Sequence, residues 1–279
     1  MNILQGNEFK KSDITLLVAT MNRNSIDFLI PMFPFAHYTK FSIVVINQTT
    51  PDNLIKSSHS SVKVINVFEK GLSKSRNLAL DNTNSKLCVI TDDDIIFKKD
   101  FETHILNTYN AIPNAALISF RVENKLGDLY KKYPDCRKEK LNHIDRLNIM
   151  SVEMVLNKSI IDKYNIRFNE QFGLGAKFGM GEEAILVNQL YKNELEVVIE
   201  PKVIVTHLEE TTHTKVSLED KYYIQGALFT ALFNKKYLLW VLLKIFFETK
   251  QGKIRINQIW KAIHRAIAGR KDFLQLHEN

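Results

Sequence analysis

The sequence predicts an α/β fold in which helices flank a central, mostly parallel sheet. Short β-branched apolar runs alternate with segments of helical length through the first half of the chain. Strand, helix and strand at this spacing are typical of a parallel sheet. The chain has 279 residues, of which 45% are hydrophobic, so one sizeable core is expected.

The first half of the chain supplies most of the expected sheet. Four near-continuous apolar runs predict strands that are buried on both faces: residues 14–19, 41–46, 62–68 and 87–91. Residues 72–82 and 100–111 read as helices, the second of which is closed by Pro113. Residues 115–122 predict a further strand.

The middle of the chain is less regular. Residues 123–146 are polar and predict an excursion over the surface, before a strand-like pattern returns at 149–156. Residues 172–181 hold four of the ten glycines, so this loop is expected to be mobile or to lie against a ligand. A helix at 182–192 and a strand at 196–206, broken by Pro201, should follow.

The net charge of +7 is confined to the end of the chain. Residues 235–279 hold ten Lys and Arg against three Asp and Glu, whereas residues 1–234 hold 28 of each. A neutral body argues against a nucleic-acid-binding protein, the non-enzymatic class that the basic chain would otherwise suggest. No nucleic-acid partner is therefore expected.

The tail combines this charge with apolar segments. Residues 222–234 and 237–247 are apolar, but Lys235, Lys236 and Lys244 interrupt them below the roughly 18 to 20 uncharged residues of a spanning helix. In a helix over 256–273, one face carries Ile256, Ile259, Trp260, Ile263 and Ile267. We therefore expect residues 235–273 to attach peripherally to an anionic membrane surface.

Cysteine content and the N-terminus bear on the compartment. The two cysteines, Cys88 and Cys136, give no disulfide framework, so a reducing compartment is expected. The first residues lack the apolar stretch of a signal peptide. The expected location is the cytoplasm, at the cytoplasmic face of the inner membrane.

The strongest local motif is the run Asp92-Asp93-Asp94 at the end of an apolar strand. Adjacent carboxylates repel one another, so they are best tolerated where a cation compensates them. Hard oxygen ligands suit Mg²⁺ or Mn²⁺, and open α/β sheets bind ligands beyond the carboxyl ends of their strands. The alternative is a solvated acidic turn.

Several segments, taken in order, resemble the family 2 glycosyltransferases of the GT-A fold, the inverting bacterial enzymes of polysaccharide, O-antigen and capsule synthesis. The segments are ITLLVATMN (14–22), GLSKSRN (71–77), CVITDDD (88–94), FNEQFGLGAKFGMGEEAIL (168–186) and His207 after a strand. The resemblance implies a GT-A catalytic domain over 1–214, with a nucleotide-sugar half at about 12–122 and an acceptor half at about 148–214. Residues 215–279 would form a C-terminal helical membrane-associating extension.

The resemblance also assigns metal and donor roles. Asp94 would ligate Mn²⁺ or Mg²⁺, with His207 as a later ligand and Asp92 on the metal, ribose or donor sugar. Asp93 would lie beside them in the donor site. The remaining donor-binding residues would be Thr20, Asn22, Asn47, Gln48 and Arg76. Many relatives carry an Asp where this chain has Asn47-Gln48, so the identity of the base stays open.

The catalytic base is expected at the start of the helix that follows the glycine loop. Transfer with inversion needs a carboxylate that takes the acceptor proton. The family's Glu-Asp pair maps to Glu182 and Glu183, where Glu replaces the common Asp, so either residue is a candidate. The alternative is that both acids only complement the helix dipole.

The resemblance predicts an inverting, metal-dependent transfer of a sugar, with a UDP-sugar as the favoured donor. The acceptor would be a hydroxyl of a glycan or glycolipid in surface polysaccharide biosynthesis. A sugar nucleotidyltransferase is the second enzyme hypothesis. It would need a glycine-rich phosphate loop after the first strand, where residues 19–23 contain no glycine.

Overall fold

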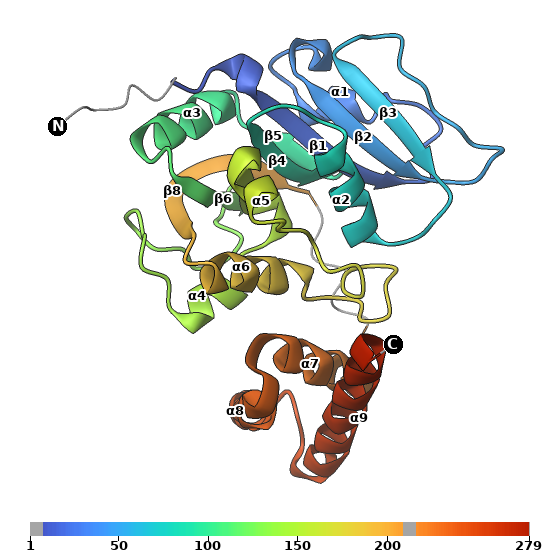
Figure 1. Ribbon diagram of the computed structural model, residues 1–279, viewed down its shortest axis with the longest axis vertical. Coiled ribbons are helices and arrows are strands. Elements are labelled where there is room, and N and C mark those ends of the chain that lie inside the picture. The colour runs from blue at the N-terminus through green and yellow to red at the C-terminus, as the bar shows by residue number, and fades with distance from the viewer. Residues whose placement is uncertain (1–7, 209–215, 279) are drawn as a thin grey trace.

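The computed structural model describes residues 8–208 and 216–278 (Figure 1). Within these ranges eight strands form one sheet in the order β3-β2-β1-β4-β7-β6-β8-β5. The strands are β1 (Ile14–Met21), β2 (Ile43–Gln48), β3 (Val62–Val67), β4 (Leu87–Asp92), β5 (Ile95–Phe97), β6 (Ala115–Asn124), β7 (Met154–Asn157) and β8 (Glu196–His207). Apart from β5, which is too short to leave a pattern, each was expected from the sequence.

The sheet is parallel on one side and mixed on the other. β3, β2, β1 and β4 run parallel to one another. β7 then pairs antiparallel with both β4 and β6, and β5 pairs antiparallel with β8. The mostly parallel arrangement predicted from the sequence is therefore confirmed for the first half and is too simple for the second.

Helices cover both faces of the sheet. One core cluster joins the sheet to α1 (Leu29–Met32) and α3 (Phe101–Ala111). The other joins it to α2 (Leu72–Asp81), α5 (Lys158–Lys163) and α6 (Glu182–Lys192). In β1, Leu16 and Val18 enter the first cluster while Leu17 enters the second, because successive strand side chains point to opposite faces. Burial of both faces explains the near-continuous apolar runs.

Two irregular segments differ in detail from the sequence prediction. β8 continues through Pro201, and its pairing with β6 shifts register between Ile199 and Val203. Proline, which has no N–H, is tolerated at such a bulge, so the predicted break is a local irregularity. The polar excursion holds α4 (His143–Leu147), and a 3₁₀ turn, Ser151–Glu153, precedes β7 and shortens the expected strand.

A three-helix module ends the chain, lying below the sheet in Figure 1: α7 (Leu218–Phe233), α8 (Tyr237–Lys250) and α9 (Ile259–Glu278). α7 and α9 cross with their backbones in contact. A Cβ on Gly226 would lie 1.9 Å from the carbonyl oxygen of Ala266, and one on Gly269 would lie 1.8 Å from that of Tyr223. The predicted domain boundary at residues 214–215 lies outside the described residues.

The apolar face expected on α9 is not the face that packs inward. α9 instead buries Ala262, Ala266, Gly269 and Phe273, since small residues allow the close crossing with α7. Ile256, Trp260 and Ile267 are exposed, whereas Ile259 and Ile263 pack at the edge of the module core. That core also includes Phe172 and Phe178 from the glycine loop, so the module is joined directly to the sheet domain.

Candidate active site

The carboxyl ends of three parallel strands bring most of the predicted site together. The register places Thr20 of β1 beside Asn47 of β2, and Ala19 of β1 beside Asp92 of β4. The three consecutive aspartates therefore lie next to the end of β1, although they are more than 70 residues away in the sequence. This is the edge at which open α/β sheets bind ligands.

Asp93 is held by the end of β1. The hydroxyl of Thr20 donates a hydrogen bond to its carboxylate, and Nε of Arg23 lies 2.7 Å from Oδ2. Arg23 was not among the predicted site residues. Its place directly after the first strand, where Thr20 and Asn22 were already singled out, was the available signal.

Asn47 and Gln48 are buried and bonded within the protein. Nδ2 of Asn47 donates to Asn66, and its Oδ1 accepts from the backbone N–H of Arg23. Oε1 of Gln48 accepts from the backbone N–H of Gly71, at the start of α2. Asn47 is 0% exposed, so these amides shape the strand edge rather than face an open pocket. This placement differs from the expected contact with a base.

Asn22 follows the end of β1 and is exposed. Its φ angle of 55° is left-handed, a conformation that Asn tolerates better than most residues. Its backbone N–H donates to the carbonyl of Gln48. The chain therefore turns sharply here, which leaves the Asn22 side chain at the rim of the site.

Arg76 lies in the interior, between the two halves of the site. Its guanidinium is 2% exposed and contacts Asp92 at 3.3 Å and Oε1 of Glu182 at 3.0 Å. It also stacks over the ring of Phe168, 5.6 Å from the centroid. Burial opposes its charge, but the carboxylates of Asp92, Glu182 and Glu183 outweigh that effect and raise the pKa of Arg76.

This position differs from the one that the sequence suggested for Arg76. The sequence suggested a side chain on the nucleotide, whereas the structure places it inside, where it joins the end of β4 to the start of α6. The same contact holds the carboxylate of Asp92 against the guanidinium of Arg76. Asp92 and Glu182 are 90 residues apart, so this connection is invisible in the local sequence.

The two glutamates that begin α6 have different surroundings. Glu182 is 4% exposed, and burial, reinforced by the neighbouring Glu183 and only partly opposed by Arg76, raises its pKa to about 7. Glu183 is half-buried, with 23% of its side chain exposed. The hydroxyl of Ser151 donates a hydrogen bond to Oε1 of Glu183. Glu183 is therefore the more accessible of the two carboxylates.

The glycine loop lies against the protein itself. Gly173 has a φ angle of 102°, and a Cβ there would lie 3.0 Å from Oγ of Ser73 and from Cδ of Glu182. The backbone N–H of Leu72 donates to the carbonyl of Leu174. The glycines thus let the loop pack between the start of α2 and the start of α6, which holds the two glutamates in place.

Asp94 and His207 meet at the far end of the aspartate run. The antiparallel pairing of β5 with β8 sets Ile95 opposite His207, which brings Nε2 of His207 to 3.6 Å from Oδ2 of Asp94. Oδ1 of Asp94 is buried and has no hydrogen-bond partner among the described residues. Burial raises the pKa of Asp94, His207 opposes this, and the neighbouring aspartates add to it.

These two side chains fit part of a divalent cation site, since an unpartnered carboxylate oxygen and an imidazole nitrogen are both metal ligands. Within residues 8–208 and 216–278, no group of three His, Cys, Asp or Glu side chains is arranged to hold a metal ion. A cation bound by Asp94 and His207 would therefore need further ligands besides these two side chains.

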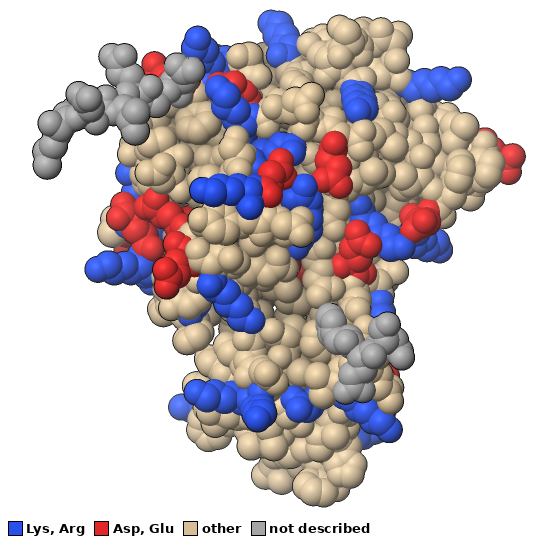
Figure 2. Space-filling model, in the orientation of Figure 1, with Lys and Arg blue, Asp and Glu red and all other residues tan. Residues whose placement is uncertain are grey.

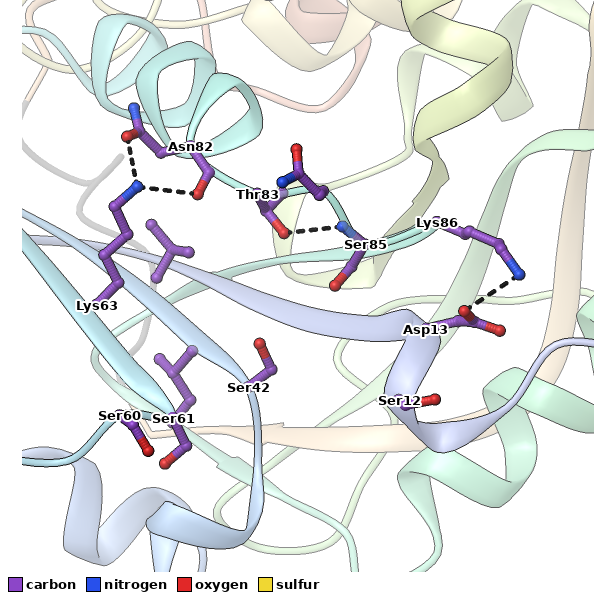
Figure 3. Close-up of a pocket in the computed structure, with 13 residues that line it drawn as sticks. Ser12, Asp13, Ser42, Ser60, Ser61, Lys63, Asn82, Thr83, Ser85 and Lys86 are labelled. Carbon is purple, nitrogen blue, oxygen red and sulfur yellow. Dashed lines mark hydrogen bonds and ion pairs between the residues drawn. The ribbon is translucent and has the colours of Figure 1, made fainter.

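A separate polar cavity of about 380 Å³ lies at the opposite edge of the sheet (Figure 3). Its walls come from the start of β2 and the turns before β1 and β4, where Lys86 pairs with Asp13. It holds none of the predicted site residues and is distinct from the carboxyl-end site.

The curled sheet flanked by helices, with acidic residues at its carboxyl edge, defines the architecture. The chain has a GT-A-type glycosyltransferase fold. Neither a protein-family model nor the sequence of a curated protein matches the chain.

Solved structures similar to this chain include S. aureus TarS 1–349, with a TM-score of 0.57 and 13% identity over 93% of this chain and 88% of that TarS fragment. The same part of TarS in complex with UDP-GlcNAc gives a TM-score of 0.58 and 15% identity, covering 94% and 80% of the two chains. The complex of the same fragment with UDP gives a TM-score of 0.53 and 15% identity, covering 93% of this chain and 88% of the fragment. The TM-scores support a shared fold, and at these low identities the similarity shows the fold alone.

Proposed function

We propose that this protein is an inverting glycosyltransferase that moves a sugar from a nucleotide-diphosphate sugar to a hydroxyl of a glycan. One observation carries the proposal. Buried Arg76 joins Asp92, the last residue of β4, to Glu182 at the start of α6, so that the aspartate run and the two glutamates share one strand edge. UDP-GlcNAc and UDP are bound to TarS in structures of this fold, which supports a UDP-sugar as donor.

Glu183 is the proposed general base. It is more exposed than Glu182, and Ser151 holds its carboxylate. In the reaction the acceptor oxygen forms a bond to the anomeric carbon while the bond from that carbon to the diphosphate breaks. The acceptor proton passes to Glu183, and the nucleoside diphosphate leaves with the electron pair. Glu182, bonded to Arg76, positions the helix start.

We further propose Asp94 and His207 as the protein ligands of Mn²⁺ or Mg²⁺. The unpartnered oxygen of Asp94 and the nearby imidazole support this role. A divalent cation bound there would supply positive charge for the departing diphosphate. Asp93, fixed by Thr20 and Arg23, would face the ribose or donor sugar.

The proposed acceptor is a lipid-linked glycan of surface polysaccharide synthesis, used at the cytoplasmic face of the inner membrane. The basic, apolar C-terminal module supports this setting, because such surfaces are attracted to anionic lipid. The module core shares Phe172 and Phe178 with the glycine loop, so an acceptor at the membrane would lie near α6.

The test measures UDP release from a panel of UDP-sugars with glycan acceptors and Mn²⁺. Glu183→Gln should lower transfer by about two orders of magnitude or more, because the general base is lost. Donor-induced thermal stabilisation should persist in this variant. Glu194→Gln, two residues beyond the end of the same helix, is the matched control and should transfer normally. No UDP release with any acceptor, or normal transfer by Glu183→Gln, would contradict the assignment.

The metal proposal has its own test. Asp94→Asn should abolish the dependence of donor-induced thermal stabilisation on Mn²⁺, whereas Asp128→Asn, on the excursion loop, should preserve it. Mn²⁺-dependent stabilisation that survives in Asp94→Asn would remove Asp94 from the ligand set.

A further inference from the structure

The C-terminal module exposes an apolar face that no other part of the described chain covers. On α8 the exposed side chains recur at helical spacing and range from 37% to 62% exposed: Leu238, Leu239, Leu242, Leu243, Phe246 and Phe247. We call this set the α8 face. The opposite side of the helix, with Val241 and Ile245, is buried in the module core. A contiguous apolar face of this kind usually marks an interaction site.

Cations flank the α8 face at both ends. Lys235 and Lys236 precede the helix, Lys250 ends it, and Lys253 and Arg255 follow it, all of them exposed. Between residues 234 and 271 the sequence contains one acid, Glu248. It is 4% exposed and pairs with Lys221 at 2.6 Å and Lys244 at 3.2 Å. In Figure 2 the lower lobe accordingly shows blue patches on a largely tan surface.

We propose that the α8 face docks on an anionic lipid surface, with its apolar side chains in the acyl boundary and the flanking cations on the headgroups. A helix with one apolar side and basic flanks lies in the plane of such an interface. A second copy of this chain fits less well, since two α8 faces would bring like charges together. The proposal rests on the membrane setting proposed above and narrows it to one helix face, but it does not depend on the sugar-transfer reaction.

A membrane-spanning arrangement is disfavoured by the packing. The helical stretch 218–250 is long and apolar enough to cross a membrane, with 33% of its most apolar window buried. The stretch bends at Asn234, whose φ angle is 48°, and the ring of Phe233 on α7 stacks on Trp240 of α8 at 4.3 Å. α8 has 14 residues, which span about 21 Å against the roughly 30 Å of a bilayer core.

The docking surface is also coupled to the catalytic part of the chain. A Cβ on Gly181, directly before Glu182, would lie 2.8 Å from the side chain of Leu228 on α7. α7 therefore packs directly against the start of α6. Lipid contact on α8 would hold the strand-edge site at a fixed position relative to the membrane.

The test is co-sedimentation of the full chain with vesicles of phosphatidylglycerol and phosphatidylcholine, compared with phosphatidylcholine alone. The protein should bind the anionic vesicles, and binding should weaken as salt rises. The double variant Leu242→Asp with Phe246→Asp should lower the partition coefficient at least tenfold. The matched control, Leu126→Asp with Leu129→Asp, alters exposed apolar residues on the excursion loop and should bind within twofold of wild type.

A second pair of variants separates charge from folding. Lys235→Gln with Lys236→Gln should weaken binding roughly fivefold per lysine, from about 1 kcal/mol each, and should flatten the salt dependence. Neutral Leu242→Ser with Phe246→Ser, checked by thermal melting, should also lose binding while remaining folded. Undiminished binding by the α8 variants would overturn the proposal. The proposal would also be overturned if the wild-type protein did not bind vesicles and light scattering showed a dimer that dissociates in the α8 variants.

Discussion

Replacing Arg76 by Met tests whether the buried charge cluster holds the two halves of the site together. Met is similar in length and apolar, so the substitution removes the charge with little loss of packing. Asp92 and Glu182 would then lose the guanidinium that contacts them at 3.3 Å and 3.0 Å. Breaking a buried pair by removing one partner costs about 3 to 5 kcal/mol, because the remaining charge is uncompensated.

The assay is urea denaturation followed by far-UV circular dichroism at pH 8. Arg76→Met should lower the free energy of unfolding by about 3 to 5 kcal/mol. The deficit should shrink at pH 5, where Glu182, whose pKa is about 7, is protonated and needs less compensation. Combining Glu182→Gln with Arg76→Met should restore part of the lost free energy of unfolding, with a coupling energy of about 1 to 3 kcal/mol between the two substitutions.

Two results would refute this reasoning. The first is a free energy of unfolding for Arg76→Met that lies within about 1 kcal/mol of the wild-type value, because an effect of that size is expected for an exposed ion pair. The second is simple additivity of Arg76→Met and Glu182→Gln. Arg167→Met, which removes a more exposed arginine that contacts Asp81 and Asp162, provides the comparison and should cost about 1 kcal/mol or less.

Three further outcomes are expected. Gly226→Ala and Gly269→Ala should each destabilise the protein by roughly 3 kcal/mol, because the added methyl meets backbone on the neighbouring helix and outweighs a helix-propensity gain of about 1 kcal/mol; thermal melting measures this. The pKa of Glu182 is raised from 4.5 to about 7, so its protonated form contributes about 3 kcal/mol to the free energy of unfolding below pH 4.5. That contribution is lost as the pH rises through 7. The free energy of unfolding of Glu182→Gln should therefore change less with pH. Thiol labelling at pH 8 should modify exposed Cys136 quickly and Cys88 slowly, because burial raises the pKa of Cys88 to about 12.

Each of these outcomes can fail clearly. Gly252→Ala, where a Cβ would meet nothing within 4 Å, is the control for the glycine pair. Its left-handed φ angle of 72° adds only a local strain of about 1 kcal/mol. A wild-type melting temperature for Gly226→Ala would mean that α7 and α9 do not cross as described. Parallel pH profiles for wild type and Glu182→Gln, or equal labelling rates for the two thiols, would contradict the burial of those groups.

Local patterns were enough to predict the strands and to place the aspartate run at the end of one of them. The run at Leu16, Leu17 and Val18 reads as a strand because helices cover both faces of the sheet and both must be apolar. The aspartates were found because they follow such a run directly. Both predictions use information contained within about ten neighbouring residues.

Long-range packing explains what the sequence did not reveal. The direction of Arg76 depends on Glu182, which lies 106 residues away. The inward face of α9 depends on Gly226, because only a glycine on α7 lets Ala266 approach so closely. The hydrophobic periodicity of this helix picked out only the isoleucine face expected at the membrane, since it weighs hydrophobicity but not how near a neighbouring backbone can come.

The charge balance at the strand edge gives an independent physical reason for the proposed cation. Among the described residues, five carboxyl groups gather there, and the guanidinium groups bonded to them come from Arg23 and Arg76. Even with Glu182 protonated, the edge stays net negative. A nucleoside diphosphate is itself an anion, so it would be repelled unless positive charge entered with it. The unpartnered oxygen of Asp94 is the position at which such a charge would be stabilised most directly.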